Sequence, residues 1–138
     1  MSRVVLIEDD EGIAELLAFN LEAAGHTVLA ARDGVSGLHL ARTSEPDVVL
    51  LDVMLPGMDG IEVCRRLRRS SSTPVIMLTA HEGSALDAVR GSSAGADGYV
   101  AKPFSIGELL SCMASVQRRE LAPQQPAESG AASGRGRL

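Results

Sequence analysis

Acidic side chains follow two apolar segments of this sequence, at the point where each segment ends. Glu8, Asp9 and Asp10 come directly after RVVLI, and Asp52 comes directly after VVLL. A carboxylate beside a core is costly unless a cation pairs with it or the site uses its charge. Acids that converge raise one another's pKa unless a cation lies among them, and oxygen ligands suit a hard divalent ion. If they meet, these residues predict a Mg²⁺ site where a phosphate can replace metal-bound water.

A hydroxyl and a lysine follow two further apolar segments. Thr79 comes after PVIML and Lys102 after GYVA. A lysine can neutralise one phosphoryl oxygen while a hydroxyl donates a hydrogen bond to another. Taken alone, Lys102 also fits a solvated loop lysine, Thr79 fits a helix N-cap, and an acid of residues 8–10 fits the start of a helix. None of these plainer explanations accounts for the carboxylate of Asp52.

Five apolar, β-branched segments alternate with segments of helical period. The expected strands are Arg3–Ile7, His26–Ala30, Asp47–Leu51, Pro74–Leu78 and Gly98–Ala101. The expected helices are Glu11–Ala24, Gly34–Thr43, Gly60–Arg69, Ser84–Ser93 and Ser105–Arg119. Strands that are continuously apolar are buried on both faces, as in a parallel sheet. The predicted fold class is α/β, a flavodoxin-like (CheY-like) doubly wound sheet of five parallel strands in the order 2-1-3-4-5, with five helices.

This strand order decides which polar side chains meet. Sites in open α/β sheets form beyond the carboxyl ends of the strands, where the strand order reverses. The first and third strands are neighbours at that point, so the acids of residues 8–10 should converge with Asp52. Lys102 and Thr79 should reach the same edge.

Two helices carry further expectations. In the first helix we expect one buried side made of Ile13, Leu16, Leu17, Leu21 and Ala24, together with Phe19, whose position is shifted from the others. The basic run RRLRR at residues 65–69 closes the third helix, where positive charge favours the helix dipole. We prefer that explanation to a docking patch.

Composition limits the class of protein. With 138 residues, 45% hydrophobic and 22% charged, the chain suits one globular domain. A net charge of −5 and 2% aromatic residues supply neither a basic footprint nor a stacking platform, which argues against direct nucleic-acid binding. Cys64 and Cys112 lack CxxC spacing and indicate reduced thiols. No apolar run approaches the ~20 residues of a membrane span and the amino terminus is unlike a signal peptide, so we expect a cytoplasmic protein without a membrane partner.

The composition changes after Arg119. Residues 120–138 are rich in Pro, Gln, Ala, Gly and Ser and show no apolar periodicity. Such a segment cannot bury a face and predicts a flexible linker or tail. We therefore expect one domain over residues 1–119 and, over residues 120–138, either a linker toward a domain absent from this chain or a tail.

Four of these motifs together are similar to the receiver domain of two-component response regulators. They are LIEDD, LLDVMLPGMDG, MLTA and YVAKPF, and the resemblance runs from about Val4 to Val116. The phrase GADGYVAKPFSIGELL resembles the OmpR/PhoB-like subfamily. The resemblance implies a signalling domain rather than a classical enzyme, one that assists only its own phosphorylation and dephosphorylation. The phosphoryl group would come from a histidine kinase phosphohistidine or a small phosphodonor.

Position by position, the resemblance assigns the acidic residues. Asp52 would be the phosphoacceptor and nucleophile. Asp9, Asp52 and the backbone carbonyl of Met54 would hold Mg²⁺, with Mn²⁺ as the alternative. Glu8 would act mostly through water, and the role of Asp10 stays open.

The resemblance also assigns the remaining site residues. Lys102 would contact the phosphoryl group, and Thr79 with Tyr99 would form the switch pair. Met54 and His81 occupy positions that influence attack by water on the acyl phosphate. Neither is an acid or an amide, so we expect slow autodephosphorylation.

The implied partners are a cognate sensor histidine kinase, which would meet the face near the first helix, and a second copy of the chain. The subfamily pairs through its fourth helix, fifth strand and fifth helix, and contacts DNA only through an output domain. Here Gly98 and Cys112 stand where the subfamily has an aspartate and an arginine, Ala88 and Ser93 also replace charged residues, and Glu108 remains. We expect a dimer face that is less charged, with apolar packing or another surface in its place.

Three other classes of protein share part of this pattern. A haloacid-dehalogenase-type phosphatase needs a second aspartate where Met54 stands, and a flavodoxin needs a phosphate loop where Glu8, Asp9 and Asp10 would repel the flavin phosphate. A receiver-like interaction module that never becomes phosphorylated is the alternative kept open. Such modules usually lose one of the residues named above, and this chain has lost none.

Overall fold

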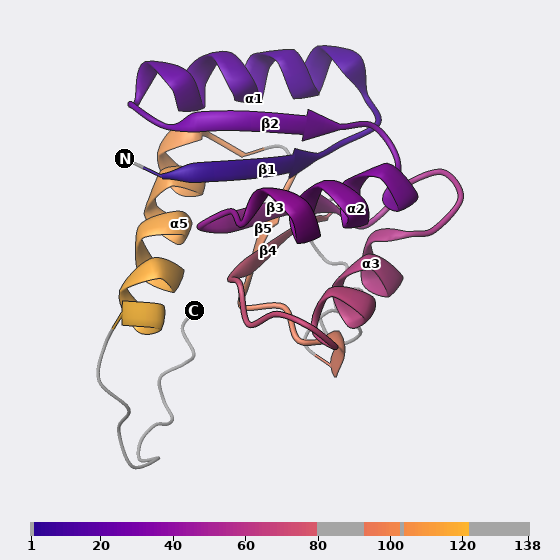
Figure 1. Cartoon of the computed structure of the whole chain (residues 1–138). Helices are drawn as coiled ribbons and strands as arrows, with labels where there is room; N and C mark the ends of the chain where they lie inside the picture. The colour runs from indigo at the N-terminus through magenta and orange to yellow at the C-terminus, as the bar shows by residue number, and fades with distance from the viewer. Residues whose placement is uncertain (1, 80–92, 103, 122–138) are drawn as a thin grey trace.

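The computed structural model describes residues 2–79, 93–102 and 104–121, with only the backbone described for the last three. Five strands form one parallel sheet in the order β2-β1-β3-β4-β5, which confirms the predicted fold (Figure 1). The strands are β1 (Arg3–Ile7), β2 (Thr27–Ala31), β3 (Val48–Asp52), β4 (Val75–Thr79) and β5 (Gly98–Ala101). The described helices are α1 (Glu11–Ala23), α2 (Gly34–Ser44), α3 (Gly60–Leu67) and α5 (Ile106–Leu121). The helix expected at Ser84–Ser93 lies, except for Ser93, outside the described residues.

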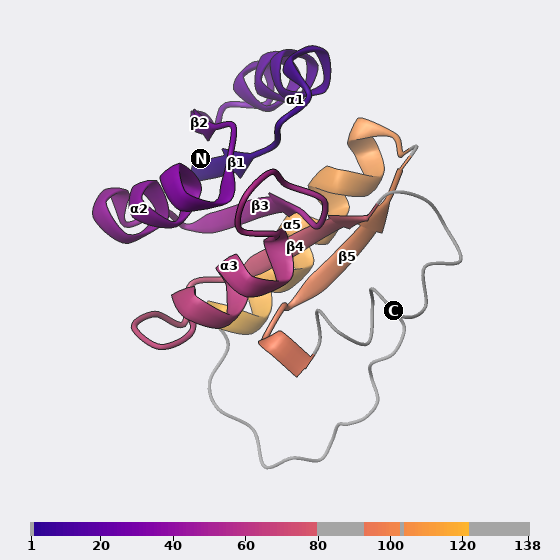
Figure 2. The ribbon, with the colours of Figure 1, turned by 90° about the vertical axis from the view of Figure 1, so that its right-hand side faces the viewer.

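Helices cover both faces of the sheet (Figure 2). One core cluster joins β1, β3 and β4 to α2 and α3, and the other joins the opposite sheet face to α1 and α5. Every residue of β3 and β4 is buried, because each of these strands has a neighbour on either side and helices above and below. The expectation of strands buried on both faces therefore holds for the interior strands, including β1 beyond Arg3, but not for β2 and β5, which lie at the edges and are partly exposed.

Side-chain caps fix where the helices begin. Asp10, Asp33 and Asp59 are the N-caps of α1, α2 and α3, and each carboxylate accepts a hydrogen bond from the backbone N–H three residues on. At the start of α5, Ser105 and Glu108 form a reciprocal capping box. The carboxylate of Glu108, which the resemblance connects with dimerisation, thus serves its own helix.

The expected buried side of α1 is wrong in three positions, because Leu16, Phe19 and the C-cap residue Ala24 are exposed. Leu16 is 62% exposed and Phe19 is 72% exposed. The residues that α1 buries are Ala14, Leu17 and Leu21, at the i, i+3 and i+7 spacing of a narrow stripe. Successive helical residues are ~100° apart, so Leu16 points well away from the stripe that includes Leu17.

None of the helices that the structure describes has both the length and the apolar character that a membrane span requires.

Candidate functional site

Asp52 is held at the carboxyl end of β3. Its side chain is buried, with the residue 4% exposed, and its Oδ1 accepts a hydrogen bond of 3.0 Å from the backbone N–H of Met54. The start of α3 packs directly on this strand end, because the N–H of Gly60 donates to the carbonyl of Val53. A Cβ atom on Gly60 would lie 2.1 Å from the carbonyl oxygen of Asp52. Only glycine permits this approach, which fixes the backbone on either side of the carboxylate.

Three carboxylates gather at this edge of the sheet. Glu8, Asp9 and Asp52 each offer one oxygen, and these oxygens lie within 4.8 Å of one another. Glu8 and Asp52 are buried while Asp9 is exposed, so the group combines a dry floor with access from solvent. An all-oxygen donor set with such access fits a hard divalent cation that keeps some of its water. The predicted convergence is confirmed for Glu8, Asp9 and Asp52, but it does not extend to Asp10.

Asp10 lies apart from this group. Its Oδ1 accepts a hydrogen bond of 2.9 Å from the backbone N–H of Ile13, at the start of α1. Its own N–H donates to Oε2 of Glu8 at 3.1 Å. Asp10 therefore acts as a helix cap and as a support for Glu8, which answers the question that the sequence left open.

Lys102, the only lysine in the sequence, bridges two of the acids. Its Nζ lies 2.8 Å from Oε1 of Glu8 and 3.3 Å from Oδ2 of Asp52. Burial acts to lower the pKa of Lys102, but the hydrogen bond to Glu8 and the charge of Asp52 outweigh it, so the pKa lies above its usual value. The direct pair with Glu8 was not foreseen, because these two residues are 94 positions apart in the sequence.

The acidic arrangement disfavours the charged form of Glu8. Its pKa is raised by burial and by the proximity of Asp52, and the hydrogen bond from Lys102 only partly opposes the shift. A carboxyl with a raised pKa next to a second buried carboxylate is a place where added positive charge is favourable. The electrostatics of the site thus agree with the geometry in favouring a cation.

The two residues predicted to form the switch pair lie on the neighbouring strands β4 and β5. Thr79 ends β4 and is buried, and its carbonyl accepts a hydrogen bond of 3.0 Å from the backbone N–H of Lys102. Tyr99 lies in β5 opposite Met77, is half-buried, and packs against the core cluster beneath α2 and α3. The backbone of β5 therefore links the lysine to the tyrosine, with two residues between them. His81 lies outside the described residues.

A family model described as the response regulator receiver domain matches residues 4–114. The chain belongs to this family. The receiver is 35% identical to the receiver domain of Francisella response regulator 1452, with a TM-score of 0.80, over 87% of this chain and 99% of that one. It is 33% identical to the Vibrio cholerae chemotaxis protein CheY4, with a TM-score of 0.79, over 84% of this chain and 98% of that one.

The receiver is also similar to one structure of an activated relative. The BeF3-activated N-terminal receiver domain of Klebsiella pneumoniae RstA is 30% identical, with a TM-score of 0.79, over 84% of this chain and 98% of that one. Membership in this family establishes a phosphoacceptor signalling domain whose phosphodonor is a histidine kinase. Receiver domains bind Mg²⁺ at an acidic pocket, and the carboxylates of Glu8, Asp9 and Asp52 form such a pocket here.

Proposed function

We propose that Asp52 is the phosphoacceptor of this receiver, in a Mg²⁺-dependent transfer from a kinase phosphohistidine or a small phosphodonor. The observation that supports it most directly is the placement of one buried carboxylate within reach of both Lys102 and the acids Glu8 and Asp9. No other acid of the described residues combines a strand end, an ammonium partner and two neighbouring carboxylates. Asp9, Asp52 and the Met54 carbonyl would hold the metal, with Glu8 acting through water.

The transfer needs a nucleophile and a way to balance charge. An oxygen of Asp52 attacks phosphorus, the bond from phosphorus to the donor nitrogen breaks, and the histidine ring keeps the electron pair and takes up a proton. A bound Mg²⁺ lowers the repulsion between carboxylate and phosphoryl oxygens. Lys102 already lies 3.3 Å from Oδ2 of Asp52, so its ammonium can follow the negative charge onto the phosphoryl group.

The signal would leave the site through Thr79 and Tyr99. A phosphoryl oxygen near Thr79 offers its hydroxyl a charge-assisted acceptor, and a shift at the end of β4 changes the packing of β5, where Tyr99 lies. The surface altered in this way would control output. We propose transcription as that output, through a DNA-binding domain that follows the linker at residues 120–138, in a cytoplasmic protein of the OmpR/PhoB-like type.

The kinase would meet the exposed side of α1. Leu16 and Phe19 are large apolar side chains that α1 leaves in solvent, with Glu15 and Glu22 also exposed on this helix. An apolar centre with a charged rim is the usual composition of a protein contact. A complementary kinase helix would present apolar residues flanked by basic ones.

The test is intact-protein mass spectrometry after incubation with acetyl phosphate and Mg²⁺. We expect one phosphoryl adduct, lost in Asp52→Asn and in the presence of a chelator. Asp10→Asn is the matched control, because an asparagine still caps α1 and the adduct should form as in the wild type. Mass is the practical measurement, since the chain has no tryptophan whose fluorescence could report on the site. An adduct that persists in Asp52→Asn would overturn the assignment, and no adduct at all would favour a phosphorylation-independent interaction module.

A further inference from the structure

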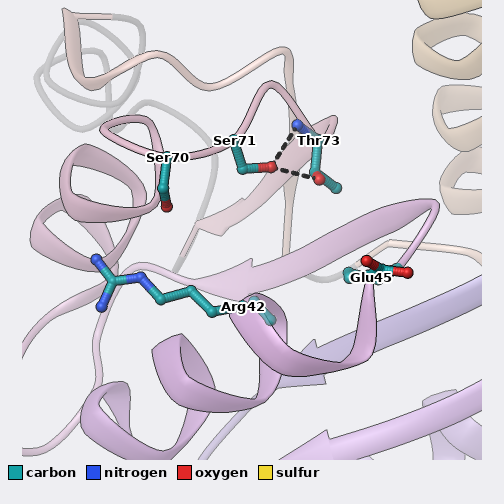
Figure 3. A pocket seen from close by; sticks show the side chains of 7 residues that line it. Arg42, Glu45, Ser70, Ser71 and Thr73 are labelled. Atoms are coloured by element: carbon teal, nitrogen blue, oxygen red, sulfur yellow. Dashed lines mark hydrogen bonds between the residues drawn. The ribbon is translucent and has the colours of Figure 1, made fainter.

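A second polar site lies at the end of the sheet opposite to Asp52. A pocket of about 570 Å³ opens between the end of α2 and the loop that leads into β4 (Figure 3). Pro46 and Thr73 belong to its lining and precede β3 and β4, whereas Asp52 and Thr79 end those strands. The pocket is therefore separated from the acidic site by the length of the central strands.

The lining combines an apolar floor with polar walls. Ala41 and Pro46 are buried, and Ser70, Ser71 and Thr73 come from the loop across from them. Figure 3 shows Arg42 and Glu45 on opposite sides of the last turn of α2, with this loop facing them. Ser71 and Thr73 are hydrogen-bonded to each other at 2.6 Å, while Ser70 makes only a 3.5 Å contact to the Leu67 carbonyl. The hydroxyl of Ser70 thus keeps most of its hydrogen-bonding capacity.

Glu45 is held in an unfavourable conformation at this pocket. It has φ 52° and ψ 59°, and it is the only non-glycine residue of the described chain with a positive φ. Glycine or asparagine usually occupies this place after a helix, because other side chains are strained there. The carboxylate also lies at the negative end of the helix dipole. In the part of the chain that the structure describes, no hydrogen bond or ion pair of this carboxylate offsets these costs.

Arg42 also lines this pocket and carries the charge opposite to that of Glu45 (Figure 3). The guanidinium donates one hydrogen bond of 3.3 Å to the carbonyl of Arg66, and among the described residues it pairs with no acid. Arg42 and Glu45 are three positions apart and both are described by the structure, yet they form no salt bridge with each other. The helix dipole by itself explains an arginine in the last turn, but it does not explain the strained glutamate beside it. Strained residues persist only where the surrounding structure holds them in place, and they cluster at ligand sites and switch regions.

We propose that this pocket binds a small zwitterion of the amino-acid or dipeptide class. The ligand's carboxylate pairs with Arg42, its ammonium pairs with Glu45, and its apolar body lies over Ala41 and Pro46. The hydroxyl of Ser70 leaves its 3.5 Å contact to the Leu67 carbonyl and donates to the ligand's carboxylate instead. The volume lies in the range of small-molecule sites, ~300–1,000 Å³. Two separated and opposite charges across an apolar floor favour this class over a simple anion, which Glu45 would repel.

The test is a titration of the ¹⁵N-labelled full chain followed by NMR. Leucine, phenylalanine and leucyl-leucine are the probes, and N-acetyl-leucine and leucinamide are the controls that each carry a single charge. We expect the zwitterions to shift the amide signals of Glu45, Ser70, Ser71 and Thr73, and the single-charge controls to bind about tenfold more weakly. No saturable shift of these signals by any zwitterion at about 10 mM would overturn the proposal.

Four variants separate binding from folding. Arg42→Gln and Glu45→Gln should each weaken binding by about tenfold, whereas Arg118→Gln, on α5, should leave it unchanged. Glu45→Gly should unfold at a higher urea concentration than the wild type, because the strain is relieved, and still bind more weakly. Equal affinity in Arg42→Gln, Glu45→Gln and the wild type would contradict the proposed contacts.

This site does not depend on the proposed phosphoacceptor. Binding should be the same in Asp52→Asn and in the presence of a chelator, because no residue of the pocket belongs to the acidic site. Phosphorylation by acetyl phosphate should likewise be retained in Glu45→Gln. Failure at one site is thus distinguishable from failure at the other.

Discussion

Gly98 of β5 and Cys112 of α5 pack directly against each other. A Cβ atom on Gly98 would lie 2.9 Å from Sγ of Cys112 and 3.4 Å from Cγ1 of Val116. These are the two positions at which the OmpR/PhoB-like subfamily would carry an aspartate and an arginine. Because the two residues are in contact, a change at one constrains the other, which gives a physical reason for both charges to be missing together.

This contact predicts energetic coupling between the two positions. Gly98→Ala should destabilise the protein because the new methyl group would displace Sγ of Cys112, and Cys112→Ala should relieve that clash. In a double-mutant cycle measured by urea unfolding, we expect a coupling free energy of about 1 kcal/mol that favours the double variant. Additive effects would mean that the two side chains do not compete for the same space.

Arg68 joins three segments of the chain. Its guanidinium donates to the carbonyl of Gly95 at 2.9 Å, to the carbonyl of Thr73 at 2.7 Å and to Oδ2 of Asp97 at 2.6 Å. Arg68→Lys keeps the charge but cannot reproduce this fork, so we expect a loss of about 2 kcal/mol in the free energy of unfolding. The neighbouring Arg69 is exposed, and Arg69→Lys should change stability by less than about 0.5 kcal/mol. Equal effects of the two substitutions in urea unfolding would refute this role.

The pair of Lys102 with Glu8 predicts a pH-dependent variant. Lys102→Met leaves two buried carboxylates without their ammonium partner, so we expect a loss of about 3 kcal/mol at pH 7 in the absence of metal. The loss should shrink as the pH falls, because the pKa of Glu8 is raised and its protonation removes one of the two charges. Urea unfolding at pH 7 and pH 5 measures both effects, with the exposed Arg118→Met as the control. A loss that is equal at both values of pH would contradict the electrostatic explanation.

Cys64 predicts a loss of stability in alkali. Burial raises the pKa of its thiol to about 11, whereas an exposed thiol ionises near pH ~8.5. Because the pKa is raised in the folded state, this thiol contributes stability that is fully present below pH ~8.5 and is lost as the pH rises toward 11. The loss at pH 10 is about 2 kcal/mol. The drop in the free energy of unfolding between pH 8 and pH 10 should therefore be smaller by about this amount in Cys64→Ala than in the wild type. The same drop in Cys64→Ala as in the wild type would assign it to other groups.

The exposed side of α1 predicts a loss of phosphotransfer without a loss of folding. The double variant Leu16→Ser/Phe19→Ser should change stability by less than about 0.5 kcal/mol, because both side chains are mostly in solvent. Its kcat/KM with a histidine kinase that phosphorylates the wild type should fall at least about tenfold, while labelling by acetyl phosphate is kept. Val35 is 62% exposed on α2, so Val35→Ser is the matched control. A similar fall in Val35→Ser would show that exposed apolar area in general, rather than this side of α1, is responsible.

The sequence by itself determined the sheet and the acids at its edge. Apolar β-branched runs and the residues that follow them are local features. The predicted strands Arg3–Ile7 and Gly98–Ala101 therefore agree fully with the structure, and the other three agree within one residue at each end. The convergence of Glu8, Asp9 and Asp52 followed from the strand order, since neighbouring parallel strands end at one edge.

Only the tertiary structure decided which side chains these residues contact and which way they point. The ion pair of Lys102 with Glu8 spans 94 positions, and the contact of Gly98 with Cys112 depends on how α5 crosses β5. Asp9 and Asp10 are adjacent and chemically alike, yet one carboxylate joins the acidic group and the other caps α1. Leu16 and Phe19 are apolar, yet the sheet offers α1 only a narrow surface to cover. Side-chain direction and packing depend on distant parts of the chain. Periodicity and the residue type at a strand end can be read from a short stretch of neighbouring residues.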